Sequence, residues 1–323
     1  MAPHHTGASR ELHVAVGSRG QLAATWFPTT ASGSPRPVLV CLPGGSYTRG
    51  YFDLEVPGHP GYSFAAHAVA RGFPVVTFDV LGTGESTRPA HDIDMHDQAG
   101  AIAAALGQLP DLVGHGGPFV AVGHSMGGYV AMLQQAAHRS YDALAILGTT
   151  NQHVAPLGLP AEMIAAAATR QGRAAIAEQI AAGIPDAYID NSRGALLSWF
   201  HLDDVPRAVV DADLATTQTV VPRRCAANAS VPGITAEAAG DVEVPVFLAY
   251  GDVDVSPAPH LEPSYFTRSR YVSLYVLAGS GHCHNMANTR VLLWDRLLDW
   301  CDTINAHRDH ESGPPGRAQG ATA

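Results

Sequence analysis

The sequence has few charges, few cysteines and no long apolar run, and each shortage excludes a class of protein. Only 15% of its 323 residues are charged while 46% are apolar. Typical soluble proteins are about 25% charged, and a disordered polymer needs a high charge density. The net charge of −10, from 19 basic and 29 acidic residues without a basic cluster, argues against nucleic acid as a partner. A small neutral or apolar ligand fits this composition better.

The four cysteines give no disulfide framework and no zinc knuckle. Cys41, Cys225, Cys283 and Cys301 are scattered and lie outside any C-x-x-C spacing, so we interpret them as reduced thiols. No stretch reaches the roughly 18 uninterrupted apolar residues that a bilayer span needs. Residues 1–12 lack the layout of a signal peptide. We therefore expect a cytoplasmic protein with no membrane partner.

Apolar runs of strand length alternate with Ala-rich helical stretches. This pattern predicts the α/β class, with a mostly parallel twisted sheet and helices on both faces. The expected strands are 12–16 and 21–27, an antiparallel opening pair, and then 38–42, 75–78, 119–122, 143–147, 246–249 and 271–276. The expected helices are 62–70, 97–109, 126–137 and 289–302.

One long stretch interrupts this alternation. Residues 151–241 are helix-prone, without a convincing buried strand, and are too many for a structureless loop. Their best helices are 162–170 and 173–182. We expect a helical cap here, inserted into a core made of residues 1–150 and 242–305. Residues 306–323 lose all periodicity, which predicts a disordered tail.

The sharpest motif is Gly123-His124-Ser125-Met126-Gly127, placed between a predicted strand and a predicted helix. A serine at such a turn is held in a strained conformation, and flanking glycines let the strand and helix pack closely. This context predicts Ser125 as a nucleophile, with an ordinary helix N-cap as the structural alternative. His124 is expected to pack, not to act.

A serine nucleophile needs a histidine base that is oriented by a carboxylate. His282 is the best candidate because it lies in a glycine-rich loop after the last predicted strand, with His284 as its rival. Asp254 follows another strand at the same edge of the sheet, 28 residues before His282. Asp252 could replace it, although a capping role suits Asp252 better.

The tetrahedral intermediate also needs two backbone donors. The N–H of Met126, first in the helix after the serine, is one. We expect the second from the turn after strand 38–42, with Gly45 favoured and Ser46 next. A plain loop glycine is the alternative for Gly45.

These motifs resemble the α/β-hydrolase fold superfamily, over about residues 12–302. Residues 79–86, Asp-Val-Leu-Gly-Thr-Gly-Glu-Ser, look like the family's D-x-x-G-x-G-x-S turn, and the order Ser125, Asp254, His282 matches its triad. The family's usual His-Gly at the oxyanion turn is here Pro43-Gly44. The resemblance implies a hydrolase that needs no cofactor and no metal.

The predicted cap is apolar, which favours a bulky neutral substrate. We expect Ser46, Tyr47, Trp199 and Phe200 to bind it, although such side chains can equally attach a cap to its core. From these motifs and the apolar cap, we expect a serine hydrolase that cleaves a carboxylic ester or lactone. A looser resemblance to hydrolases of large lactones, including zearalenone-type macrolactones, nominates a macrocyclic lactone.

Three alternatives remain. The same triad supports an acyltransferase or a hydrolase of carbon–carbon bonds. A catalytically inactive ligand-binding receptor on the same fold belongs to another class. Metal-dependent hydrolysis through His282, His284 and Asp254 lacks a third histidine. The sequence leaves open whether the protein forms a homo-oligomer.

Overall fold

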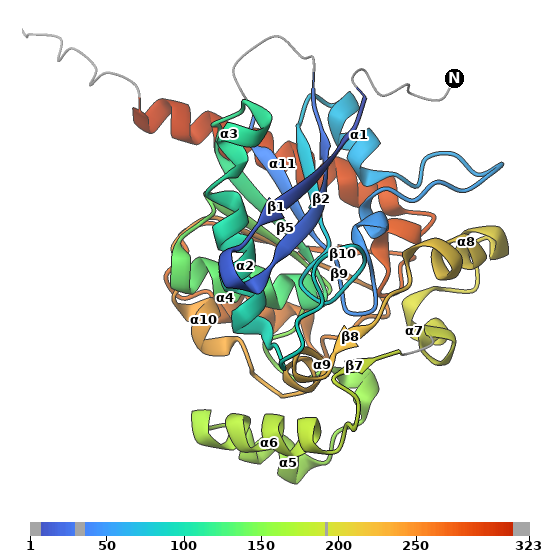
Figure 1. Ribbon diagram of the computed structural model, residues 1–323, viewed down its shortest axis with the longest axis vertical. Coiled ribbons are helices and arrows are strands. Elements are labelled where there is room, and N and C mark those ends of the chain that lie inside the picture. Colours follow the sequence, from blue (N-terminus) through green and yellow to red (C-terminus); the bar gives the residue numbers. More distant parts are fainter. Residues whose placement is uncertain (1–7, 30–35, 191–192, 313–323) are drawn as a thin grey trace, which may run out of the picture.

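The computed structural model describes residues 8–29, 36–190 and 193–312, and shows the expected α/β class. An eight-stranded sheet lies at the centre in the order β1-β2-β4-β3-β5-β6-β9-β10 (Figure 1). Its strands are β1 Arg10–Ala15, β2 Gln21–Phe27, β3 Val38–Leu42, β4 Val75–Phe78, β5 Phe119–His124, β6 Ala143–Leu147, β9 Val246–Gly251 and β10 Val272–Leu277. The β1–β2 and β2–β4 pairs are antiparallel and all others are parallel, so the prediction of a mostly parallel sheet is confirmed.

Helices cover both faces of this sheet. The helices α2 (Met95–Leu106) and α4 (Met126–His138) share one core with it, and α1 (Phe64–Ala70) and α11 (Arg290–Ser312) share the other. Strands β3 and β6 are buried along their whole length. Continuous apolar runs suit strands that pack on both faces, which explains why their predicted bounds agree with the structure.

Two helix boundaries differ from prediction for local reasons. The α2 helix begins two residues before the expected 97 because Asp94 and Asp97 form a capping box. It ends at Leu106 instead of 109, and a separate short helix, α3 (Leu109–Val113), follows with Pro110 in its first turn. A proline has no N–H for a helix interior, so the expected single helix is divided.

The inserted segment, residues 151–241, joins β6 to β9. Its elements are α5 Ala161–Ala166, α6 Arg170–Ala182, β7 Tyr188–Ile189, α7 Leu197–Phe200, α8 Arg207–Thr217, β8 Val221–Pro222, α9 Arg223–Ala229 and α10 Ala236–Gly240. The expected helix 162–170 stops at Ala166 because Thr169 caps α6 instead. The short β7–β8 pair is not among the expected elements. Figure 1 shows α5 and α6 at the lower end of the molecule, away from the sheet.

The C-terminal expectation is wrong for part of its range. The α11 helix continues to Ser312, so residues 306–312 are helical despite their lack of apolar periodicity. Residues 313–323, also assigned to the tail, lie outside the described residues. No helix within the described ranges is long and apolar enough to cross a membrane.

Candidate active site

Ser125 occupies the tight turn between β5 and α4. Its backbone lies at φ 52° and ψ −118°, in a region that is strained for a residue with a side chain. A Cβ atom on Gly123 would lie 2.6 Å from the carbonyl oxygen of Gly127, and one on Gly127 would collide with the backbone of Leu42. Only glycine fits at the positions two residues before and two residues after this serine.

Asp254 and His282 lie in the loops that follow β9 and β10, and their buried side chains are hydrogen-bonded. His282 Nδ1 lies 2.6 Å from Asp254 Oδ1. A carboxylate only accepts, so Nδ1 bears the proton and Nε2 keeps its lone pair, as a general base requires. His282 Nε2 has no bonded partner in the described chain and keeps contact with solvent.

Ser125 and His282 both pack against the end of β6. Ser125 N donates to the Leu147 carbonyl oxygen at 2.8 Å, and a Cβ on the adjoining Gly148 would lie 3.1 Å from the His282 ring. His124 is buried, and its Nε2 lies 2.9 Å from the His282 carbonyl oxygen. Ser125 Oγ bonds to no residue in the described ranges. Serine and imidazole therefore share one corner of the sheet, with the hydroxyl unengaged.

The structure places the two rival residues differently. His284 Nε2 lies 2.8 Å from Asp254 Oδ2, so one carboxylate lies between two imidazoles. Its other nitrogen, Nδ1, is buried without a partner in the described chain, so it cannot reach a substrate. Asp252 is exposed, and its Oδ2 accepts from Gly279 N at 2.6 Å. Asp252 thus fastens the loop after β10 and does not orient an imidazole.

Four donors surround the Asp254 carboxylate. Besides the imidazoles, Gly251 N donates to Oδ2 at 2.9 Å and Val255 N donates to Oδ1 at 2.7 Å. Burial by itself raises the pKa of Asp254, but the charges and hydrogen bonds of His282 and His284 outweigh burial and hold that pKa well below its usual range. Asp254 is therefore an anion that can stabilise a cationic His282. Across the described residues, no group of three or more His, Cys, Asp or Glu has the arrangement of a metal site.

The turn after β3 approaches the serine. Residues 44–47 close with a hydrogen bond of 3.3 Å from the last N–H to the Gly44 carbonyl oxygen, and Ser46 has φ 65°. A Cβ on Gly44 would lie 3.1 Å from Ser125 Cβ. Replacing the family's usual His-Gly by Pro43-Gly44 therefore leaves this close approach intact.

The predicted oxyanion donors lie on this turn and at the start of α4. The N–H groups of Gly45, Ser46 and Met126 donate to no residue in the described part of the chain. A Cβ on Gly45 would lie 2.9 Å from Met126 Cε, so the two segments are in contact. Unpaired backbone donors that converge beside a nucleophile are what an oxyanion hole requires.

The D-x-x-G-x-G-x-S turn after β4 supports the oxyanion turn. Asp79 is buried and forms an ion pair with Arg49, whose backbone N–H also donates to Asp79 Oδ1 at 2.7 Å. Ser86 Oγ donates to the Asp79 carbonyl oxygen at 2.7 Å. A side chain on Gly84 would collide with the Asp79 carboxylate. The motif is thus structural and fastens the chain two residues after Tyr47.

Trp199 and Phe200 approach His282 from the inserted segment. Their ring centroids lie 5.3 Å and 5.4 Å from that of His282. The backbone joins them too, because His282 N donates to the Trp199 carbonyl oxygen at 2.9 Å. Trp199 is half-buried, whereas Phe200 is buried. Trp199 therefore keeps exposed surface beside His282, whereas Phe200 is packed inside the protein.

Tyr47, also predicted to bind substrate, has its hydroxyl engaged inside the protein. The side chain is 1% exposed, and the oxygen lies 3.0 Å from Asp213 Oδ2 and 3.0 Å from Cys283 Sγ. Its ring stacks on Phe200 with centroids 6.2 Å apart. Ser46 is buried as well. The structure therefore gives Tyr47 a packing role beside the site.

The sequence reasoning missed a buried ionic network around this tyrosine. Arg193 and Asp213, both without exposed side-chain surface, are 3.0 Å apart. Arg193 also donates to Thr217 Oγ1 at 2.9 Å, and its Cζ lies 3.8 Å from the Tyr47 ring centroid. One signal in the sequence could have indicated it: Val209, Asp213 and Thr217 are spaced four residues apart and so share one face of a helix, with Val209 marking the buried face.

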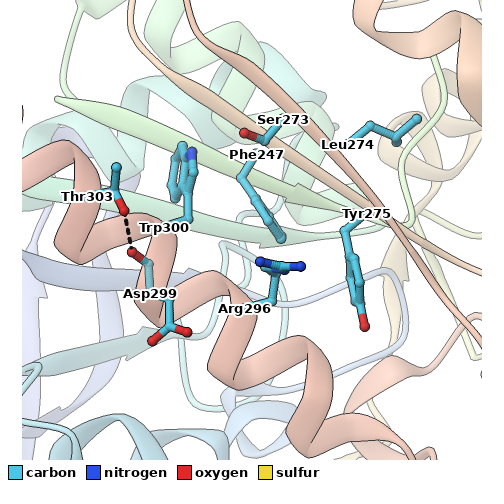
Figure 2. A pocket seen from close by; sticks show the side chains of 8 residues that line it. All are labelled: Phe247, Ser273, Leu274, Tyr275, Arg296, Asp299, Trp300 and Thr303. Atoms are coloured by element: carbon cyan, nitrogen blue, oxygen red, sulfur yellow. Dashed lines mark hydrogen bonds between the residues drawn. The ribbon is translucent and has the colours of Figure 1, made fainter.

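A cavity of about 460 Å³ lies elsewhere, between the outer strands and α11 (Figure 2). Its walls include Phe247 and Tyr275 from the sheet and Arg296 and Trp300 from the helix. None of its lining residues is among the predicted site residues. Phe247 stands near the amino end of β9, whereas Asp254 follows its carboxyl end. This cavity is therefore separate from the serine–histidine corner.

Comparison with known proteins identifies the family of this chain. A model of the alpha/beta hydrolase family matches residues 39–292. The chain belongs to that family. No curated protein sequence matches it.

Solved structures of several hydrolases share the fold. A soluble variant of monoglyceride lipase from Saccharomyces cerevisiae has a TM-score of 0.66 at 16% identity, covering 94% of this chain and 99% of its own. Proline iminopeptidase from Mycobacterium smegmatis gives 0.62 at 16%, covering 93% and 100%. A thermophilic esterase from Thermogutta terrifontis gives 0.58 at 18%, covering 91% and 99%. At such identities the likeness shows the fold alone, and membership of the family indicates a hydrolase.

Proposed function

We propose that this alpha/beta hydrolase is a serine hydrolase that cleaves a carboxylic ester or lactone through an acyl-enzyme, in the cytoplasm and without a cofactor. One observation supports it above the others. The Asp254–His282 hydrogen bond leaves Nε2 open at the same corner where the strained turn holds Ser125. Acyl transfer by a serine hydrolase requires such a nucleophile, base and orienting carboxylate.

The reaction follows from these positions. His282 Nε2 takes the proton of Ser125 Oγ as that oxygen bonds to the carbonyl carbon, and the carbonyl oxygen becomes an anion beside the N–H groups of Gly45 and Met126. The carbon–oxygen bond to the leaving group then breaks, and the alkoxide takes the proton from His282. In the second half of the reaction, water gives a proton to His282 and attacks the carbonyl carbon of the acyl-enzyme. The bond to Ser125 Oγ then breaks, Oγ takes the proton from His282, and the carboxylic acid leaves. Each step returns its proton, so no other reactant is needed.

The walls of the site favour a bulky apolar substrate. Trp199 contributes an indole beside His282, and Met126 and Val221 lie at 2.9 Å and 3.8 Å from a Cβ placed on Gly45. Burying such surfaces contributes about 25 cal/mol for each Å² removed from water. A macrocyclic lactone is the nominated substrate because it combines an ester bond with a large apolar ring.

The test is a hydrolysis screen of aryl esters, alkyl esters and lactones of graded ring size. We expect Ser125→Ala to lower kcat/KM by about 10⁴-fold or more, and the exposed Ser198→Ala, in the same region, to leave it unchanged. A fluorophosphonate should label the native chain at Ser125. Turnover that survives Ser125→Ala would refute the proposal.

The other candidate functions give different results in the same assay. An acyltransferase would form a new ester when an alcohol acceptor is present, and a carbon–carbon hydrolase would cleave none of the esters. A receptor would bind lactones but resist labelling. Product analysis by mass spectrometry separates these outcomes.

A further inference from the structure

We propose that His284 is a positioning residue that holds the Asp254 carboxylate from the side opposite to His282. This inference rests on the proposed function, because it concerns the same proton transfer. The carboxylate is shared: His282 Nδ1 lies 2.6 Å from Oδ1 and His284 Nε2 lies 2.8 Å from Oδ2. A Ser–His–Asp triad needs only the first of these bonds.

The two imidazoles are equipped for different tasks. Because carboxylate oxygens only accept, His282 bears its proton on Nδ1 and His284 bears its proton on Nε2. His282 Nε2 keeps contact with solvent, whereas His284 Nδ1 is buried without a partner in the described ranges. A proton placed on that nitrogen would be a buried charge without an acceptor, which is costly. His284 is therefore built to donate a hydrogen bond and His282 to exchange a proton.

His284 is itself held firmly. It begins a short 3-10 turn, His284–Met286, and is 1% exposed. A Cβ on Gly148 would lie 3.2 Å from its ring, so a larger residue there would press on it. Titratable groups close to it include Asp254, His282, the adjoining Cys283, and His124, whose ring centroid lies 5.6 Å away. No rotation of this imidazole is available without repacking the corner.

The second bond limits how the carboxylate can turn. Gly251 N and His284 Nε2 occupy Oδ2, and Val255 N and His282 Nδ1 occupy Oδ1. Without His284, Oδ2 keeps only its backbone donor, and three donors in place of four restrain the tilt of the carboxylate plane. A tilt at Asp254 changes the direction of His282 Nδ1–H and therefore the aim of Nε2. Without this bond, the negative charge of Asp254 interacts with one imidazole instead of two. Asp254 then stabilises the protonated form of His282 more strongly.

Two substitutions separate the roles. We expect His284→Leu, which removes the donor, to lower kcat by about 10- to 100-fold, the effect of one hydrogen bond to a charged group. The acidic limb of its pH–rate profile should move to higher pH. His284→Gln keeps a donor on its amide and should recover most of the loss.

A matched control shows whether the effect is only structural. Asn285 is also buried in this turn and accepts from Trp294 Nε1 at 2.8 Å, without contacting Asp254. Asn285→Ala should destabilise the protein but leave the acidic limb where it is. Nitrogen-15 histidine NMR adds a second readout: two strongly downfield imidazole protons are expected, of which His284→Gln removes one and His282→Gln the other.

The outcomes are distinct from failure of the proposed function. If Ser125→Ala keeps its turnover, the serine mechanism fails whatever His284 does. If turnover depends on Ser125 but His284→Leu keeps the wild-type kcat and acidic limb, only the positioning role is overturned. If His282→Gln stays active while His284→Gln is inactive, His284 is the base and the inference is wrong. Should His284→Leu not fold, the NMR signals decide, because the absence of a downfield imidazole proton that His284→Gln removes would overturn the positioning role.

Discussion

At the scale of single residues, the proposed chemistry depends on which aspartate faces His282. Asp254 accepts from His282 and its side chain is buried, whereas Asp252 accepts from a backbone N–H and is exposed. We expect Asp254→Asn to lower kcat by about 10⁴-fold, because an amide can turn its NH₂ to the ring and favour the wrong tautomer. Steady-state kinetics measure this, with Asp252→Asn as the matched control. Comparable losses in the two variants would contradict the assignment.

His124 gives the site a pH-dependent contribution to stability. Burial lowers the pKa of His124, and the charges of His282 and His284 lower it further. Histidine in an unfolded chain titrates at about pH 6.5. Below that pH, His124 binds a proton in the unfolded chain but stays neutral in the folded chain. The resulting stability is fully present above about pH 6.5 and is lost as the pH falls, by up to about 1.4 kcal/mol per pH unit.

We therefore expect His124→Gln to make the free energy of unfolding less dependent on pH between about 6.5 and 5. Urea unfolding at a series of pH values measures the slope. The exposed His91→Gln serves as the control and should keep the wild-type slope. An unchanged slope in His124→Gln would show that this imidazole binds a proton equally readily in the folded and the unfolded chain, and would contradict its lowered pKa.

At the scale of elements, buried charge holds parts of the inserted segment together, and Asp213 also contacts Tyr47 of the core. Arg193 and Asp213 form an ion pair without exposed side-chain surface, and burial, which raises the pKa of Asp213, is outweighed by His201 and Arg193, which lower it. We expect Arg193→Met to lower the free energy of unfolding by about 3 to 5 kcal/mol because it leaves the buried Asp213 carboxylate without its cation. Urea unfolding should show this loss.

A matched surface pair provides the contrast. Arg207 and Asp211 are exposed neighbours on α8, and Arg207→Met should leave the unfolding midpoint unchanged. In addition, Arg193→Met/Asp213→Leu should recover much of the stability lost by the single variant, since it removes both charges. A double variant as unstable as the single one would mean that packing, not charge, is responsible.

At the scale of the whole molecule, all four thiols lie inside. Cys41, Cys225, Cys283 and Cys301 are buried, and burial raises the pKa of each. We expect no rapid reaction with a disulfide reagent in the folded protein and reaction of four thiols in guanidinium. Thiol titration in the two states checks this, and a fast-reacting thiol in the native protein would contradict the burial.

The sheet was predictable because buried parallel strands are continuous apolar runs that end at proline or glycine, as 38–42 does at Pro43. The tight turn at Ser125 was predictable because its flanking glycines have a steric cause. Helix ends were less so, since single side chains such as Thr169 decide them. The Tyr47–Asp213 contact joins residues 166 positions apart, and no local pattern determines such a pairing.

The backbone also joins the inserted segment to the oxyanion turn. Thr48 N donates to the Thr217 carbonyl oxygen at 2.8 Å, and Thr219 N donates to that of Ser46 at 3.0 Å. These two bonds fix residues 217–219 to the turn that carries the predicted oxyanion donors. An outward movement of residues 217–219 would break these bonds or displace the turn with the predicted oxyanion donors, so we expect a large substrate to enter past another part of the inserted segment.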